Sequence, residues 1–235
     1  MNGVDVGGYL IVVAHPDDEV LGAGATIASL TSQGADVRGC ILAGTVDARR
    51  RRPTDEELLI DTRAAAAALG MGDPIMGEFP NLAMNTVPHL DLVQFIEAAM
   101  ETTGAVHLVT HHPSDLNDDH RQVSLACQAA ARLSARQPGK PRLRALHYME
   151  VVSSTDWAFP GSNEGFRPNA FYEVGEANLR RKLEALACYR DVMRPYPHPR
   201  SEQAIRGLAT YRGGQANMNL AEAFQSAFLD LAAWS

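Results

Sequence analysis

Residues 9–19 read YLIVVAHPDDE, an apolar run that ends directly in a cluster of ionisable side chains. The apolar run at 9–14 has the length of a strand, and its lack of alternation is typical of a strand covered on both faces. The small-residue segment 21–33 then predicts a helix that ends at Gly34. A buried strand followed at once by a helix is the unit from which parallel sheets are built.

The alternation of strand and helix patterns continues along the chain. It predicts strands over 36–43, 74–78, 106–110, 145–152 and 171–174, helices over 53–70, 87–101, 118–135 and 177–189, and a further amphipathic candidate for a helix over 220–234. Repeated units of this kind predict an α/β fold with a mostly parallel sheet and helices on both faces. The loop-rich stretches 133–144 and 153–169 are too short to link domains, so residues 1–235 are predicted to form one domain.

The composition is that of an ordinary soluble globular protein. Of the 235 residues, 46% are hydrophobic and 21% are charged, which excludes disordered, collagen-like and disulfide-scaffold classes. The net charge of −7 argues against nucleic acid as a partner. One basic run, the four arginines at 49–52, departs from this trend, and it is interpreted either as a solvated loop or as a contact for an anionic substrate or partner.

The sequence predicts a cytoplasmic protein without a membrane span. No apolar run approaches the roughly 18 residues that would cross a bilayer. The N-terminus lacks the basic and apolar regions of a signal peptide. Cys40, Cys127 and Cys188 are odd in number and widely spaced, which favours reduced thiols over a disulfide framework.

Four ionisable residues follow the first predicted strand at the edge where parallel sheets bind ligands: His15, Asp17, Asp18 and Glu19. Burying such a cluster is costly unless its members are paired or coordinate a cation. Because Pro16 stiffens the turn, His15 and Asp18 can face one point while Asp17 points elsewhere. The alternative is that Asp17 or Asp18 only caps the following helix.

A second polar cluster, residues 111–120, follows the buried strand predicted over 106–110. Because parallel strands end at one edge of a sheet, we expect His15, Asp18 and His120 to converge as a two-histidine, one-carboxylate site. Three protein ligands with an open fourth position are typical of catalytic zinc. Zinc lowers the pKa of bound water to roughly 7, and Asp17 could take the proton as a general base in amide or ester hydrolysis. The alternative is that Asp118 and Asp119 cap a helix and the histidines are ordinary loop residues.

At these residues the sequence resembles the LmbE-like, or PIG-L-type, N-acetylglucosaminyl de-N-acetylase family. The hallmark is A-H-P-D-D-E at 14–19 with a later D-H at Asp119-His120. Further segments of the chain resemble one bacterial subgroup with D-x-N-x-D-H-R and PHPRS motifs: Phe79-Pro80-Asn81, Thr110-His111-His112-Pro113, Asp115-Leu116-Asn117, Ser153-Ser154-Thr155-Asp156-Trp157, Phe166-Arg167-Pro168-Asn169, Pro197-His198-Pro199-Arg200-Ser201 and Ala221-Glu222-Ala223-Phe224.

The resemblance implies a Rossmann-like fold and one Zn²⁺, with Fe²⁺ or another divalent ion in some members. By position, it makes His15, Asp18 and His120 the metal ligands and Asp17 the base. It implies that an N-acetylated amino sugar or its conjugate is cleaved to the free amine and acetate. It also implies a homo-oligomer.

The chain departs from the family pattern at two places. Asn117 stands where many members carry a histidine that assists the oxyanion or the leaving amine, so His198 is the candidate for supplying the proton. The early Arg-x-x-Glu of many members is replaced at Leu58 and Asp61, which puts the substrate's identity in doubt.

Three further residues are candidates for substrate binding. Asn117 can donate a hydrogen bond but cannot act as an acid. Trp157 could stack on a sugar ring or pack in the core. Arg200 could bind an anionic substrate group or form an ion pair at a turn.

Two other functions compete with de-N-acetylation. One is an amidase acting on a larger or non-sugar amide. The other is a metal-bound protein that binds a ligand without turnover, an interpretation motivated by Asn117. A dinucleotide-binding protein is excluded, because Gly22-Ala23-Gly24 lacks the continuation of the G-x-G-x-x-G motif.

Overall fold

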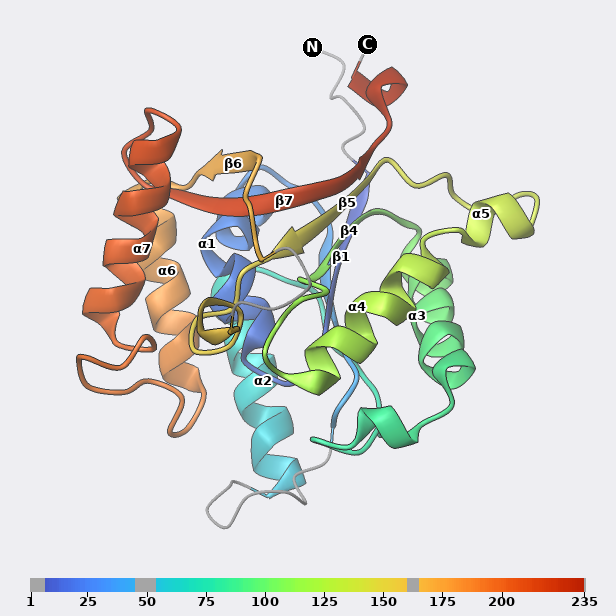
Figure 1. The fold of residues 1–235 in the computed structure, drawn as a ribbon, viewed down its shortest axis with the longest axis horizontal. Helices are drawn as coiled ribbons and strands as arrows, with labels where there is room; N and C mark the ends of the chain where they lie inside the picture. The colour runs from blue at the N-terminus through green and yellow to red at the C-terminus, as the bar shows by residue number, and fades with distance from the viewer. Residues whose placement is uncertain (1–6, 45–53, 160–164, 235) are drawn as a thin grey trace.

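The computed structural model describes residues 7–44, 54–159 and 165–234. Its centre is a seven-stranded sheet with the order β3-β2-β1-β4-β5-β7-β6 (Figure 1). The strands are β1 (Gly8–Val13), β2 (Val37–Ile41), β3 (Ile75–Met76), β4 (Ala105–His111), β5 (Ala145–Met149), β6 (Ala170–Glu173) and β7 (Ala221–Leu229). Among these strands β7 alone runs in the opposite direction to the others, so the sheet is mostly parallel, as the sequence predicts. The arginine run at 49–52 lies outside the described residues.

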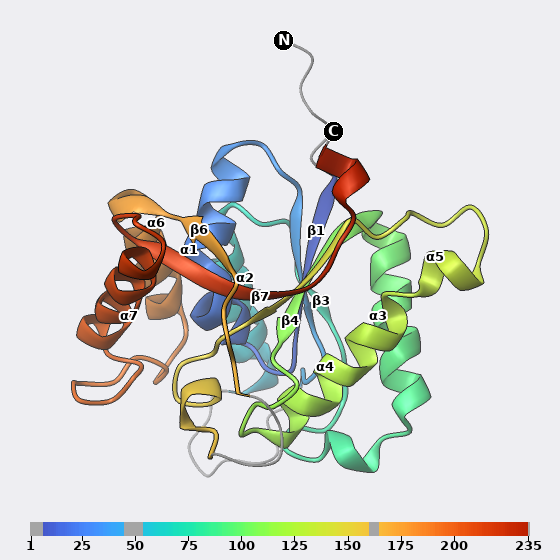
Figure 2. The ribbon, with the colours of Figure 1, turned by 45° about the horizontal axis from the view of Figure 1, so that its top comes forward.

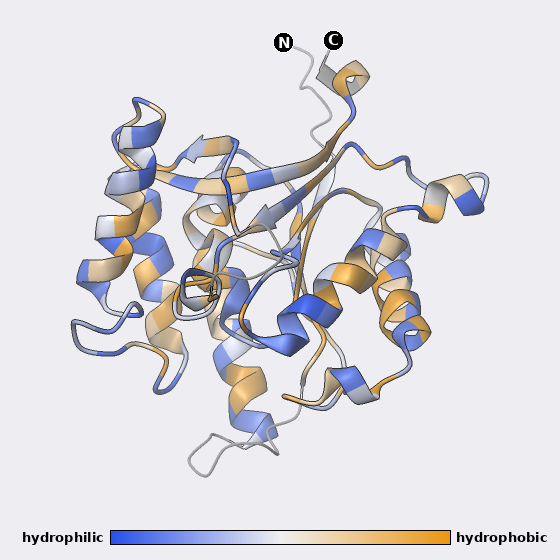
Figure 3. Cartoon of the chain, viewed as in Figure 1, coloured by the Kyte–Doolittle hydropathy of each residue, from blue (hydrophilic) through white to orange (hydrophobic). Residues whose placement is uncertain are grey.

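Helices cover both faces of the sheet, which confirms the predicted α/β class. One apolar layer contains residues of α1, α2, α6 and α7, and the other contains residues of α3 and α4 (Figure 2). The helices are α1 (Asp18–Ser32), α2 (Asp55–Leu69), α3 (His89–Thr103), α4 (Asp118–Ala130), α5 (Leu133–Arg136), α6 (Gly175–Cys188) and α7 (Glu202–Gln215), with 3₁₀ turns η1 (Met84–Thr86), η2 (Thr155–Trp157) and η3 (Leu231–Trp234). Hydrophobic residues line the central strands, whereas the first turns of α2 and α4 are hydrophilic (Figure 3).

The register of the sheet places the two polar clusters side by side. β1 lies between β2 and β4, and Val12 pairs with Thr110 near the carboxyl end of both strands. The backbone N–H of Ala14 donates to Nε2 of His111 over 2.8 Å, which ties the ends of the two strands together. The chain therefore leaves β1 and β4 at one edge of the sheet, as expected.

Two glycines allow α1 to lie close to the sheet and to α6. A Cβ atom at Gly22 would lie 2.3 Å from the sulfur of Met149 on β5. A Cβ atom at Gly24 would lie 2.9 Å from Cγ of Lys182 on α6. The Gly-Ala-Gly stretch thus serves close packing of the helix that carries Asp18.

The structure corrects the prediction for the end of the chain. The segment predicted as a possible helix over 220–234 contains strand β7, which pairs with both β5 and β6. Glu222 and Phe224 both face the layer that contains α1 and α6. Alanine and glutamate favour helices by local propensity, but pairing on both sides and the burial of Glu222 against Lys182 outweigh it. The predicted helix over 118–135 is also divided into α4 and α5.

No helix in the described part of the chain is long and apolar enough to cross a membrane. All three cysteines lie within the described residues and are free; Cys40 and Cys127 are buried.

Candidate metal centre

Three side chains bring one ligand atom each to a common point. Nδ1 of His15 lies 3.2 Å from Oδ2 of Asp18 and 3.3 Å from Nε2 of His120, and the third side of the triangle is 3.1 Å. Tetrahedral zinc with bonds of about 2.0–2.1 Å holds its ligand atoms about 3.3–3.4 Å apart. The triangle therefore fits one zinc-sized cation, and the structure brings together all three predicted ligands.

The local backbone sets the direction of each ligand. His15 follows β1, Asp18 opens α1, and His120 lies in the first turn of α4. Oδ2 of Asp18 also accepts the backbone N–H of His15 over 3.0 Å, which fixes the carboxylate. All three side chains are buried, so the ligand atoms meet in a medium of low polarity.

The charges of the ligands show that the site favours a positive charge. Burial alone raises the pKa of the Asp18 carboxyl, but the charge of His120 and hydrogen bonds from His120 and His15 hold that pKa well below its usual range. Burial lowers the pKa of His120, but the carboxylates of Asp18 and Asp115 raise it to about 10. A bound cation would displace this proton and take over its role in neutralising Asp18.

Each of the two candidate histidine ligands donates a hydrogen bond from its second ring nitrogen to a buried carboxylate. Nδ1 of His120 lies 3.2 Å from Asp115, and Nε2 of His15 lies 3.0 Å from Asp119. Such partners fix the ring orientation and the tautomer of metal-binding histidines. The two acids are the first and fifth residues of the D-x-N-x-D-H motif, and the sequence alone predicts this role for neither of them.

The two supporting carboxylates are themselves held by hydrogen bonds. Asp115 accepts from Oγ of Ser154 over 2.5 Å and from Oγ1 of Thr155 over 2.6 Å. Asp119 accepts the backbone N–H groups of Leu82 over 2.6 Å and Met84 over 3.0 Å. The carboxylate of Asp119 therefore does not cap α4, and the alternative that this residue is only a helix cap is wrong.

His111 is a further buried residue at the site, and the sequence alone predicts no role for it. Its ring stacks on that of His120 with 3.8 Å between centroids and an interplanar angle of 16°. Its Nε2 accepts from Ala14, so the proton of the neutral ring lies on Nδ1. Burial and the charge of His120 lower its pKa to about 3, which keeps it neutral.

Asp17 lies outside the three-atom cluster, as the stiff His-Pro turn predicts. Its backbone has φ 102° and ψ −28°, and its side chain makes no cap hydrogen bond to α1. Oδ2 of Asp17 instead lies 3.1 Å from Nη1 of Arg200. Behind this turn, buried Glu19 accepts from the N–H of Asp17 and from the hydroxyl of Tyr189, so it holds the backbone of the turn in place.

The other candidate residues surround the site in different ways. Asn117 caps α4, because its Oδ1 accepts the N–H of Asp119 over 2.9 Å. Trp157 is 47% exposed, which argues against core packing, and its ring contacts that of His198 edge-on at 5.7 Å. Nδ1 of His198 accepts the N–H of Arg200 over 3.1 Å, so the proton of the neutral ring lies on Nε2.

The fold and the site define an α/β protein with a buried two-histidine, one-carboxylate centre at the carboxyl ends of parallel strands. The chain belongs to the PIG-L family (GlcNAc-PI de-N-acetylase), whose family model matches residues 10–131. This matched part contains all three candidate ligands and Asp17.

A curated deacetylase resembles part of the chain in sequence. The 1D-myo-inositol 2-acetamido-2-deoxy-alpha-D-glucopyranoside deacetylase of Mycolicibacterium paratuberculosis is 36% identical over 116 residues, which cover 41% of this chain and 38% of that protein. The chain thus matches less than two fifths of the relative's length.

Two solved structures share the fold over nearly the whole chain. The N,N'-diacetylchitobiose deacetylase from Pyrococcus horikoshii has a TM-score of 0.71 at 16% identity, covering 96% of this chain and 86% of that one. The 4-carboxy-2-hydroxymuconate hydratase from Pseudomonas putida KT2440 has a TM-score of 0.75 at 20% identity, covering 96% and 98%. At these identities the likeness concerns the fold alone, and it includes a protein named for a different reaction.

Proposed function

We propose that the chain is a single-domain, zinc-dependent hydrolase that removes the acetyl group from an N-acetylated amino sugar or its conjugate. The observation that carries the proposal is the buried triangle of His15, Asp18 and His120 with Asp17 beside it but outside the ligand set. A three-ligand centre leaves a position for water, and the neighbouring carboxylate supplies a base. Membership of a family of de-N-acetylases supports the choice of reaction.

The donor set suits Zn²⁺ and also admits Fe²⁺, since two imidazoles and one carboxylate bind either ion. When bound, such an ion lowers the pKa of water to about 7 and polarises a carbonyl oxygen. The remaining steps belong to the chain's own side chains.

Asp17 is the proposed proton carrier. Its carboxylate accepts a proton from the attacking water, whose oxygen forms a bond to the carbonyl carbon of the acetamide. The bond from that carbon to nitrogen then breaks, and the same proton passes to the departing nitrogen. The products are acetate and the free amine, so no other reactant is needed.

His198 is proposed to donate a hydrogen bond from Nε2 to the substrate. Burial and the charges of Arg200 and Arg194 lower its pKa below the usual value, so the ring is neutral near pH 7. A neutral ring can orient the acetamide or a sugar hydroxyl, but it is a weak source of a full proton. This argues for Asp17 as the proton carrier. We therefore propose that His198 orients the substrate and does not supply the proton.

The substrate class follows from the relatives and from the surroundings of the metal centre. The curated relative is named for a 2-acetamido-2-deoxy-glucopyranoside, and the Pyrococcus protein for diacetylchitobiose. The half-exposed ring of Trp157 offers a face on which a sugar can stack. Asn117 keeps its amide nitrogen as a proposed donor, because only Oδ1 is used by the helix cap.

The free cysteines support a reducing compartment, and we propose that the protein lies in the cytoplasm.

We also propose that the protein forms a homo-oligomer, which the resemblance to the family supports.

The reaction is tested by measuring acetate and amine release from a panel of N-acetyl amino sugars and their conjugates. The same sugars carrying longer acyl groups, and simple non-sugar acetamides, serve as competing substrates. Release of acetate from the sugars in preference to the others supports the proposal. Preference for longer acyl groups or non-sugar amides identifies an amidase, and the absence of turnover in the metal-loaded protein would identify a binding protein.

A further inference from the structure

Arg200 bridges two segments of the chain beside the metal centre. Its Nη1 lies 3.1 Å from Oδ2 of Asp17, and its Nε donates to Oγ of Ser153 over 2.8 Å. The side chains of Arg200 and Asp17 are only 18% and 13% exposed, so the ion pair is largely shielded from water. An arginine in this position holds two groups with one rigid fork.

Both residues that the guanidinium group of Arg200 contacts have a strained backbone. Asp17 has a φ of 102° and Ser153 has a φ of 67°, which are unusual for residues other than glycine. Such conformations persist only where the surrounding structure enforces them, and they gather at functional sites. The guanidinium group of Arg200 is one contact shared by these two positions.

Arg200 is itself presented by an ordered turn. Its N–H donates to Nδ1 of His198, and its carbonyl oxygen accepts the N–H of Arg194. The next residue, Ser201, caps α7 through the N–H of Ala204. The guanidinium group therefore projects from a fixed backbone just before a helix.

The contact at Ser153 connects Asp17 with the metal ligands. Ser154, the next residue, donates from Oγ to Asp115, which holds His120. One short segment after β5 thus supports the carboxylate of Asp17 on one side and a ligand of the metal centre on the other. This gives a physical role to the Ser-Ser-Thr motif that follows β5.

We propose that Arg200 is a positioning residue that holds the Asp17 carboxylate at the metal centre, and that it does not anchor an anionic group of the substrate. The inference rests on the proposed function, in which Asp17 handles the proton. Misplacement of a catalytic group by about 1 Å can cost roughly a hundredfold in rate, so the effect of losing Arg200 falls on kcat.

The test compares Arg200→Met, Arg200→Lys and Ser153→Ala with Arg206→Met, which removes an arginine that α7 presents to Glu176 and Glu202 at the surface. Arg200→Met is expected to lower kcat by about a hundredfold, with KM within threefold of the parent and the metal retained. Arg200→Lys restores part of the rate, Ser153→Ala loses less than Arg200→Met, and Arg206→Met matches the parent. Added guanidinium ion partly restores an Arg200→Ala variant.

A second readout does not depend on turnover. Hydrogen–deuterium exchange of the peptide covering residues 14–20 is expected to be faster in Arg200→Met than in the parent or in Arg206→Met. A raised KM with kcat unchanged would overturn the proposal in favour of a substrate anchor, and unchanged exchange in this peptide would overturn it as well. If the parent protein cleaves no substrate, the proposed function fails, whereas the exchange experiment still decides whether Arg200 holds Asp17.

Discussion

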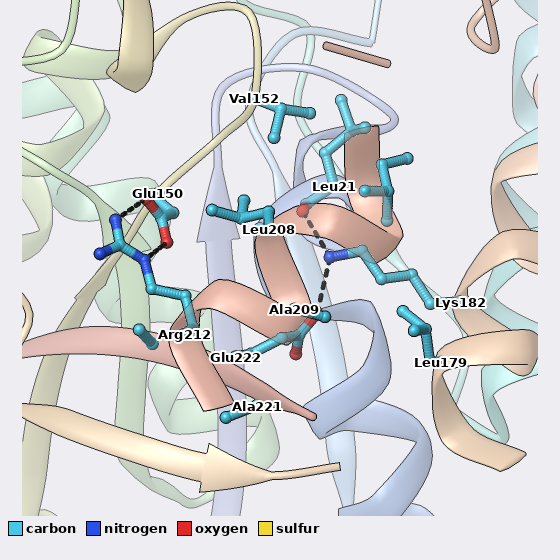
Figure 4. A pocket seen from close by; sticks show the side chains of 13 residues that line it. Leu21, Glu150, Val152, Leu179, Lys182, Leu208, Ala209, Arg212, Ala221 and Glu222 are labelled. Carbon is cyan, nitrogen blue, oxygen red and sulfur yellow. Dashed lines mark hydrogen bonds and ion pairs between the residues drawn. The ribbon is translucent and has the colours of Figure 1, made fainter. Parts of the chain in front are cut away.

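Nζ of Lys182 on α6 lies 2.6 Å from Oε1 of Glu222 on β7, and the pair is buried against the backbone of α1 (Figure 4). Lys182 also donates to the carbonyl oxygen of Leu21 over 2.7 Å. Glu222 accepts the N–H groups of Ala25 and Thr26 over 3.1 and 2.7 Å. The pair therefore joins α1, the helix that carries Asp18, to α6 and β7. Both charged groups also form hydrogen bonds to the backbone of α1.

Removing one charge of this pair should destabilise the fold. Lys182→Met leaves the Glu222 carboxylate buried without its counter-ion, which we expect to lower the free energy of unfolding by about 3–5 kcal/mol. The double variant Lys182→Met/Glu222→Gln should lose less than the sum of the single variants. The exposed pair of Arg206 provides the control, since Arg206→Gln should cost less than about 1 kcal/mol. Urea unfolding measures the parent, Lys182→Met, Glu222→Gln, the double variant and Arg206→Gln, and a loss in Lys182→Met as small as in the control would contradict this account.

Asp115 should tune the affinity for the metal, because it holds the ring of His120. Asp115→Asn is expected to weaken metal binding about 10- to 100-fold, as measured by competition with a chelator. Asp118→Asn is the matched control, because Asp118 lies three residues away and pairs with Arg121 at the surface. Equal affinities in the two variants would show that Asp115 does not support the ligand.

His147 should make the fold sensitive to acid. Burial and the nearby His107 lower its pKa to about 4 in the folded chain, and its Nδ1 has no hydrogen-bond partner. The unfolded chain takes up a proton below about pH 6.5, whereas the folded chain does not until about pH 4. The contribution of His147 to the free energy of unfolding is thus fully present above pH 6.5 and is lost as the pH falls to about 4. It amounts to at most about 3 kcal/mol.

The measurement is the free energy of unfolding between pH 7 and pH 4 for the parent and for His147→Gln. The parent should lose more stability than the variant over this interval. Parallel curves would show that His147 does not contribute to the acid sensitivity.

Asp17→Asn should separate catalysis from metal binding. The amide cannot accept the proton of the attacking water, so kcat/KM should fall about 10²- to 10⁴-fold while the metal content stays at that of the parent. Acetate release at substrate concentrations below KM measures the change. A variant with nearly full activity would exclude Asp17 as the proton carrier.

Much of the site is predictable because local patterns determine where the polar clusters fall. His15, Asp18 and His120 follow two buried strands, and parallel strands end at one edge, so their convergence follows from the pattern. The partners of these ligands are less predictable. Asp119 resembles a helix cap in sequence, and its contact with His15 depends on how α4 meets β1.

Contacts between distant segments lie beyond a single sequence. Arg200 and Asp17 are 183 residues apart, and nothing local marks them as a pair. The same holds for β7, because Glu222 is accommodated in a strand only through Lys182 and the backbone of α1. In both cases a buried charge finds its partner through tertiary packing rather than through local propensity.

The most direct test of the central claim is the metal content of the protein purified without added metal, measured by elemental analysis for the parent, Asp17→Asn and His120→Ala. The account predicts about one zinc or iron ion per chain in the parent and in Asp17→Asn, and loss of the ion in His120→Ala, because His120 supplies one of only three ligands. A parent protein that binds no metal even after reconstitution with zinc would contradict the proposed hydrolase.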